Sequence, residues 1–274
     1  MPAVKYAKPP VVERAAAVFV HMDEEIYESK FQTWRQMVEK ELPVYEPLNE
    51  WLINIEQKEG KATTDPLRTE LRITPRFSKK KIAEGFEWGI RCPREALIVN
   101  MGSQPGSPSH YIDLRTSFAL WFSRWSSHFE VQRLRRVNLH YVNLLNVQTV
   151  SPFMAPGPQS VPQHPGFIQL DKIIKVFVPL PIQKGALIPP LSCQATVMLE
   201  GREDSALQII LASIPNYPPQ PTLRLDFITE TAVAEGSSLD EILKTLDWCH
   251  DRVIECFEAV FTDAAKESFE PMHS

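Results

Sequence analysis

The stretch 133–145 alternates between polar and apolar side chains near the middle of the chain. Successive side chains of a β-strand point to opposite faces, so residues of one parity lie on one side of the sheet. Arg136, Asn138 and His140 share one side, and the other side holds the set Val137, Leu139, Tyr141 and Leu145. The segment therefore predicts a central strand with one face in the core and the other face carrying hydrogen-bond donors and a titratable ring.

Other segments predict that this strand belongs to an antiparallel sheet. Residues 11–20 are rich in alanine and valine, which is typical of a buried strand. Residues 67–77 alternate as expected for a half-solvated antiparallel strand. Further strands are expected over 51–56, 86–91, 96–101, 192–200, 206–213 and 222–232.

Apolar residues at three-to-four spacing predict helices over 27–41 and in a long C-terminal segment from residue 238 onward. Ser238 followed by Glu241 is typical of a capping box at the start of that last helix. Residues 110–129 are ambiguous: we expect a strand over 111–115 that runs into a helix over 117–128. Antiparallel strands with helices packed on one face of the sheet give the α+β fold class.

A proline-rich segment divides the chain into two parts. Residues 151–166 contain five prolines and two glycines, as expected for a linker or a long packed loop. We expect an N-terminal α+β half over 1–150 and a C-terminal half of three strands and a helix over 167–274. A chain of 274 residues can bury a substantial core, so the two halves are expected to pack as one unit.

Composition and motifs exclude several classes of protein. The net charge of -5 gives no electrostatic reason to expect nucleic acid. The glycine motifs of nucleotide sites, the zinc-protease helix motif and the serine-hydrolase elbow are absent, so no cofactor, metal or catalytic residue is predicted. The four cysteines lack metal-site spacing, and the chain has neither a signal-peptide pattern nor an apolar run of membrane length. These features favour a cytoplasmic protein with free thiols.

Three segments resemble a sporadically distributed bacterial protein family of unknown function. They are KPPVVERA at 8–15, RVNLHYVN at 136–143 and LDWCHDRVIECFEAVFTD at 246–263. The third segment is expected to be helical and contains His250, Thr262 and Asp263. The sequence departs from the family pattern at Asn138, where the family has glycine, and at His140, where it has arginine. The resemblance implies a bacterial cytoplasmic protein, and it implies no reaction.

The polar side of the central strand is the first candidate binding site. Arg136, Asn138 and His140, together with Glu13, could bind an anion or a peptide carboxylate, because they offer a planar guanidinium and further donors. The competing interpretation is a solvated strand face or a buried network that ties the sheet together.

Charged residues inside the buried-looking strand 11–20 require partners. An unpaired charge in a core is costly, so Glu13 is expected to form an ion pair with one of three cations on the central strand. Those cations are Arg133, Arg135 and Arg136. A catalytic role for Glu13 is the alternative.

Two further clusters lie outside the central strand. Asp247 and His250 are three residues apart on the last helix and share a face, which suits an acid–base pair, two metal ligands or a structural contact. Arg133 and Arg135 follow an aromatic run and could contact nucleic acid, if that run stacked bases rather than packing in the core. The run consists of Phe118, Trp121, Phe122, Trp125 and Phe129.

The sequence thus supports two hypotheses of function. The first is a non-enzymatic binding, regulatory or adaptor protein of a bacterial accessory system, such as a defence or mobile-element system, with another protein as its partner. The second is an enzyme or a small-ligand or anion sensor with its site over 133–145. We expect nucleic acid and membranes not to be partners, and the sequence leaves homo-oligomerisation open.

Overall fold

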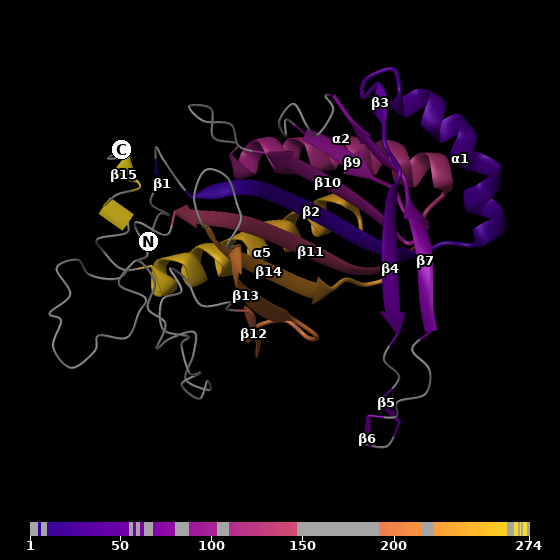
Figure 1. The fold of residues 1–274 in the computed structure, drawn as a ribbon. Helices are drawn as coiled ribbons and strands as arrows, with labels where there is room; N and C mark the ends of the chain where they lie inside the picture. The colour runs from indigo at the N-terminus through magenta and orange to yellow at the C-terminus, as the bar shows by residue number, and fades with distance from the viewer. Residues whose placement is uncertain are drawn as a thin grey trace, which may run out of the picture.

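The computed structural model describes residues 10–54, 68–79, 88–102, 110–146, 192–214 and 222–261, with the short pieces 5–6, 57–58, 61–62, 266–267, 269 and 271–272. A large antiparallel sheet of nine strands dominates this part of the chain (Figure 1). Its strand order is β12-β13-β14-β11-β2-β10-β9-β8-β3. The bounds are β12 Ser192–Met198, β13 Ala206–Ile214, β14 Thr222–Ala232, β11 Arg133–Asn146, β2 Val11–His21, β10 Ala96–Gly102, β9 Trp88–Arg91, β8 Arg76–Ser78 and β3 Val44–Tyr45.

The alternating stretch 133–145 forms β11, a central strand of this sheet, as predicted. β11 lies between β14 and β2 and is antiparallel to both. The predicted division by parity is confirmed, because Val137, Leu139 and Tyr141 are buried while Arg136 is exposed and His140 is half-buried. The register aligns Tyr141 with Phe227 of β14 on one side and with Arg14 of β2 on the other.

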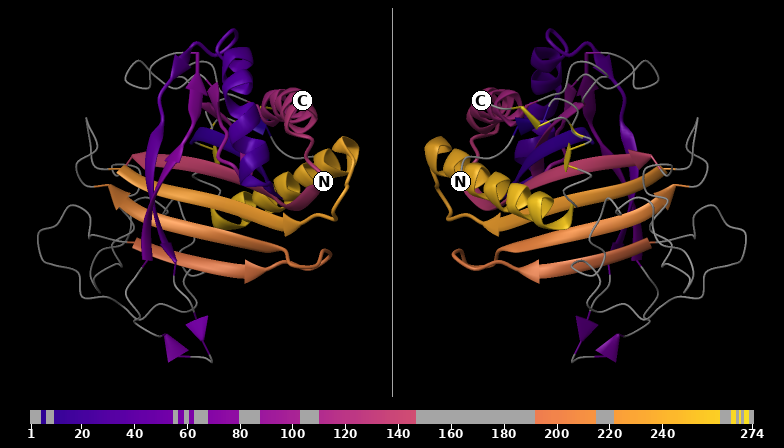
Figure 2. Two further views of the ribbon diagram at one scale, coloured as in Figure 1. Left: turned by 90° about the vertical axis from the view of Figure 1, so that its right-hand side faces the viewer. Right: turned by 90° about the vertical axis from the view of Figure 1, so that its left-hand side faces the viewer.

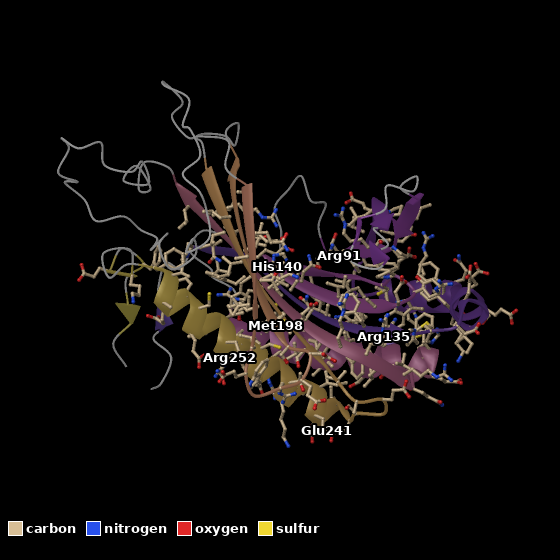
Figure 3. All side chains as sticks on the ribbon, turned by 90° about the horizontal axis from the view of Figure 1, so that it is seen from below. Arg91, Arg135, His140, Met198, Glu241 and Arg252 are labelled. Carbon is tan, nitrogen blue, oxygen red and sulfur yellow. The ribbon has the colours of Figure 1, made fainter. Side chains whose placement is uncertain are left out.

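Three helices in the described part of the chain cover one face of the sheet, which confirms the α+β class. They are α1 (Glu24–Val38), α2 (Tyr111–Phe129) and α5 (Leu239–Val260). In the right-hand view of Figure 2, α5 lies in front of the strands. The separate hairpin of β4 (Leu48–Asn54) and β7 (Arg68–Thr74) lies on the opposite side of the sheet from α5 (Figure 3).

The expected strand over 111–115 is wrong, because α2 already begins at Tyr111. The carboxylate of Asp113 accepts a hydrogen bond from the backbone N–H of His110, which stabilises the first turn of the helix. Leu114 then continues the buried stripe of the helix one turn before Phe118. With this turn included, the apolar positions of the whole segment have helical spacing.

The predicted strand over 67–77 is divided into two by Pro75. The part before it is β7, which pairs with β4, and the part after it is β8, which joins the large sheet. Proline has no N–H to donate to a strand ladder, so it favours such a break. The expectation for 151–166, and with it the domain boundary, lies outside the described residues.

The core lies between the sheet and the helices and is rich in aromatic side chains. Trp34 of α1 meets Trp121 of α2 edge to face, with the ring centroids 6.1 Å apart, and it also contacts Phe129. At the start of α5, the hydroxyl of Ser238 accepts from the backbone N–H of Glu241, and the carboxylate of Glu241 accepts from that of Ser238. The predicted capping box is thereby confirmed. No helix among the described residues has the length and apolar character needed to cross a membrane.

Candidate functional site

The polar residues of the central strand lie on the face of the sheet that is turned away from α5. We call this the polar face and define it by Glu13, Asn100, Arg136, His140 and Asp226. Figure 3 shows His140 on this side of the sheet. Because the side-chain period of a strand is two, neighbouring strands add their own polar residues at matched positions.

Small residues of β2 lie beside the predicted site residues. The register aligns His140 with Ala15 and Asn138 with Ala17. Alanine side chains leave room above β2, so larger polar side chains on both sides can extend over it. On the other edge of β11, Asn138 is aligned with Glu230 and His140 with Ile228.

Asp226 is the centre of a hydrogen-bonded trio on the polar face. Its carboxylate is almost fully buried and accepts from His140 Nε2 at 3.1 Å and from Arg224 Nη2 at 2.6 Å. Burial alone would raise the pKa of Asp226, but the hydrogen bonds from His140 and Arg224 outweigh burial and lower it. The carboxylate is therefore ionised and cancels the charge of Arg224.

The expected ion pair between Glu13 and an arginine of the central strand is wrong. Glu13 is aligned with Val142, whereas Arg136 is aligned with Phe19, six residues further along β2. Six residues of a strand span roughly 20 Å, which no pair of side chains bridges at ion-pair distance. Glu13 Oε1 instead accepts from Asn100 Nδ2 of β10 at 3.1 Å.

Arg136 has partners of its own at the far end of the polar face. Its Nη1 donates to Oε2 of Glu230 at 3.3 Å, and its guanidinium lies over the ring of Phe19, 4.5 Å from the centroid. Both ends of this ion pair are partly exposed, so the pair itself contributes little to stability. The predicted residues thus share one face but form three separate contacts along it.

The aromatic residues that could stack on nucleic-acid bases are not at the surface. The aromatic run on α2, from Phe118 to Phe129, is buried in the core, so its rings are not accessible to bases. Arg133 and Arg135 are exposed at the beginning of β11, where the register with β2 shifts between Leu134 and Arg136.

On the helix side, residues of α2, β11 and α5 form a second polar cluster. We call it the tyrosine–histidine network and define it by Tyr111, Arg115, Tyr141, Asp247 and His250. The Tyr141 hydroxyl lies 2.8 Å from His250 Nδ1, and the Tyr111 hydroxyl donates to Asp247 Oδ1 at 2.8 Å. Arg115 donates to both carboxylate oxygens of Asp247, at 2.8 and 3.1 Å.

Burial shifts the titration of this network. Desolvation and the nearby guanidinium of Arg14 lower the pKa of His250 to about 4, so its imidazole is neutral near pH 7. Desolvation also raises the pKa of Tyr111, and it raises the pKa of Tyr141, so both are phenols rather than phenolates. Arg14 itself is buried against Tyr141, with its guanidinium 5.1 Å from the ring centroid.

The sequence found only part of this network. The prediction that Asp247 and His250 share a helix face is confirmed, because both contact Tyr111. As metal ligands, Asp247 and His250 would need a third donor nearby. In the described part of the chain, no cluster of three His, Cys, Asp or Glu residues suited to a metal occurs. The network holds α2, α5 and β11 together, and Tyr111 was missed because its segment was interpreted as a strand.

Comparisons with models of protein families, with curated proteins and with solved structures found no match to this chain.

Proposed function

We propose that this chain is a non-enzymatic adaptor or regulatory protein that binds a protein partner through its polar face. The observation that carries the proposal is the arrangement of paired charges on that face. Arg136 with Glu230, and Arg224 with Asp226, place exposed or half-exposed cations next to carboxylates along β11 and β14. A surface of both signs is suited to a protein surface of complementary pattern, which gains specificity from correct pairing.

A small anion is a less suitable ligand for the polar face, because the positive charge of Arg224 is already neutralised by Asp226. Arg224 is the cation beside His140, and its guanidinium donates to Asp226 through both Nε and Nη2. An incoming anion would have to displace a carboxylate that is already desolvated and doubly hydrogen-bonded. A partner that leaves this trio intact and contacts its rim avoids that cost.

A catalytic function has one supporting feature. Asp226 holds the imidazole of His140, in the way that a carboxylate orients the histidine base of a hydrolase. A hydrolase would also need a hydroxyl or thiol at hydrogen-bond distance from the imidazole, and the described residues supply none in contact with His140. We therefore place binding ahead of catalysis. The bacterial accessory setting of the proposal rests on the resemblance of the three sequence segments.

The test uses charge reversal on the polar face with a control on the helix side. Arg136→Glu reverses an exposed cation beside Glu230, while Lys244→Glu makes the same change at an exposed position of α5. Tagged wild type and both variants are used to capture proteins from the native host, and the candidate is then purified and titrated directly. We expect one stoichiometric protein that binds wild type and Lys244→Glu, and binds Arg136→Glu at least tenfold more weakly.

Two results would overturn the proposal. One is that no stoichiometric protein is recovered with the wild type, and the other is that both variants bind the partner as wild type does. His140→Gln separates the alternative function, because it removes the titratable ring while keeping a polar side chain. A hydrolytic activity that depends on His140 and not on Arg136 would favour the enzyme.

A further inference from the structure

The large sheet ends at β12, whose outer edge has no strand beside it among the described residues. Its inner edge pairs with β13 along the full length, from Ser192 opposite Ala212 to Met198 opposite Ala206. An outer edge of this kind presents a row of backbone N–H and C=O groups, which are a template for pairing with another strand.

The composition of β12 lacks the usual protection of an edge strand. Its sequence, SCQATVM, contains no lysine, no acidic residue and no proline. Charged side chains and prolines are the common means by which edge strands avoid pairing with other chains. Val197 and Met198 are 50% and 69% exposed, so the edge also offers apolar surface.

The other end of the sheet differs in both respects. β3 consists of Val44 and Tyr45 alone, which is too short to template a ladder. The guanidinium of Arg35 lies over the ring of Tyr45, 4.1 Å from its centroid, and places a cation at that edge. Of the two terminal strands, β12 is therefore the one that is long, uncharged and without a neighbouring strand in the described part of the chain.

Among the elements that the structure describes, the helix layer stops before it reaches β12. The right-hand view of Figure 2 shows α5 crossing in front of β14 and β11. β13 and β12 follow β14 towards the edge of the sheet, outside the area that α5 covers. The register aligns Val197 with Leu207, which belongs to the buried core. Val197 therefore lies on the core side of the sheet, on a strand that α5 does not cover in that view.

We propose that β12 is a self-association surface and that a second copy of this chain pairs with it, antiparallel, across a two-fold axis normal to the sheet. An uncharged strand meets its own copy without like-charge repulsion, which a charged edge could not do. The two-fold axis keeps both helix layers on one side of the joined sheet. Val197 of each copy then lies in a continuous apolar layer between the two α5 helices. This proposal is independent of the polar face.

The test measures mass in solution and removes the edge by charge. Sedimentation equilibrium of the full chain, from low to high micromolar concentration, is expected to show a dimer. The double variant Thr196→Lys, Val197→Lys places cations on both faces of β12, and we expect a monomer over the same range. Ile112→Lys is the matched control, since it replaces another exposed apolar side chain, on α2, and is expected to leave the dimer intact.

Hydrogen exchange locates the contact and covers the case in which the double variant unfolds. In the wild type, a peptide that spans 192–198 is expected to exchange more slowly at high than at low protein concentration, while a peptide from α2 is expected not to change. A wild type that stays monomeric overturns the proposal. So does a dimer that survives in a folded double variant, or a dimer without concentration-dependent protection of β12.

Discussion

The imidazole of His250 lies flat against the phenol ring of Tyr111, with the ring centroids 3.9 Å apart and the planes 9° from parallel. This stack connects α5 to α2. The hydroxyl of Tyr141 extends it to the sheet through Nδ1 of His250. Two helices and the central strand are thus joined through one half-buried histidine, and the stability of their packing should depend on this contact.

The Tyr111 hydroxyl and the Tyr111 ring should contribute separately. Tyr111→Phe keeps the stack on His250 and removes the hydrogen bond to Asp247, so we expect a loss of about 1 kcal/mol in the free energy of unfolding. Tyr111→Leu also removes the stack and should cost roughly 0.5–1.5 kcal/mol more. Urea titration measures both values, and Ile112→Ala is an exposed neighbour that should change stability little. Equal losses for the two Tyr111 variants would contradict a role for the ring.

Stability should fall as the pH drops from about 6.5 to about 4. The pKa of His250 is about 4 in the folded protein, below the ordinary value of 6.5 in an unfolded chain. The unfolded state therefore binds the proton more readily in this window, and protonation favours unfolding. The effect has an upper limit of roughly 3 kcal/mol, which corresponds to the full shift.

Replacement of the imidazole should flatten this pH dependence. His250→Phe keeps an aromatic ring beside Tyr111 and has no group that titrates in the window. Thermal unfolding of both proteins at several pH values between 4 and 7 makes the comparison. Asp226 should add a second contribution at more acidic pH, because its pKa is lowered in the folded protein. The stability that its carboxylate contributes is present above the pKa of an unfolded aspartate and is lost as the pH falls through the lower pKa of the folded state. Equal slopes for wild type and His250→Phe would show that His250 is not the group responsible.

The elements of this fold were predictable where one periodicity dominates. The alternation of β11 identified the buried and polar faces, and the spacing along α5 together with Ser238 identified that helix and its start. The segment of Tyr111 was not identified, because its first turn carries Tyr, Ile, Asp and Leu in an order that suits a strand as well as a helix. Helix packing decides such cases, and packing is not local in sequence.

Partners on the polar face were less predictable than its residues. Glu13 was expected to pair with an arginine of β11, but the register places Arg136 far along the strand. Register depends on bulges and turns as well as on pattern. Asp226, which is the partner of His140, was not identified, although it alternates with Leu225 and Phe227 and has the same parity as Arg224 and Glu230. An acid that alternates with apolar residues and lies two positions from an arginine was the available signal.

Asp226 should matter more to stability than Glu230. Asp226→Ala removes a buried carboxylate that accepts charge-assisted hydrogen bonds from Arg224 and His140, so we expect a loss of about 1–3 kcal/mol. Glu230→Ala breaks the partly exposed pair with Arg136 and should cost less than about 0.5 kcal/mol. Chemical denaturation at neutral pH and moderate salt ranks the two variants. A larger loss for Glu230→Ala would mean that the trio around Asp226 does not stabilise the sheet.

Gly89 should not tolerate a side chain, because the neighbouring strand passes too close. A Cβ at this position of β9 would lie 2.5 Å from the backbone oxygen of Phe77 and 3.3 Å from the Cβ of Ser78. Phe77 is fully buried, and its strand β8 is paired with β9, so relief of the clash requires movement of backbone rather than of a flexible side chain. We therefore expect Gly89→Ala to cost about 1–3 kcal/mol, as overpacking does elsewhere.

Gly236→Ala is the comparison, since that residue has a φ of 75° and open space around it. It should cost about 1 kcal/mol from backbone strain alone. Hydrogen exchange should distinguish the two causes, with faster exchange in β8 and β9 for Gly89→Ala only. Unchanged protection of those strands, together with wild-type stability, would contradict the close approach of β8 and β9.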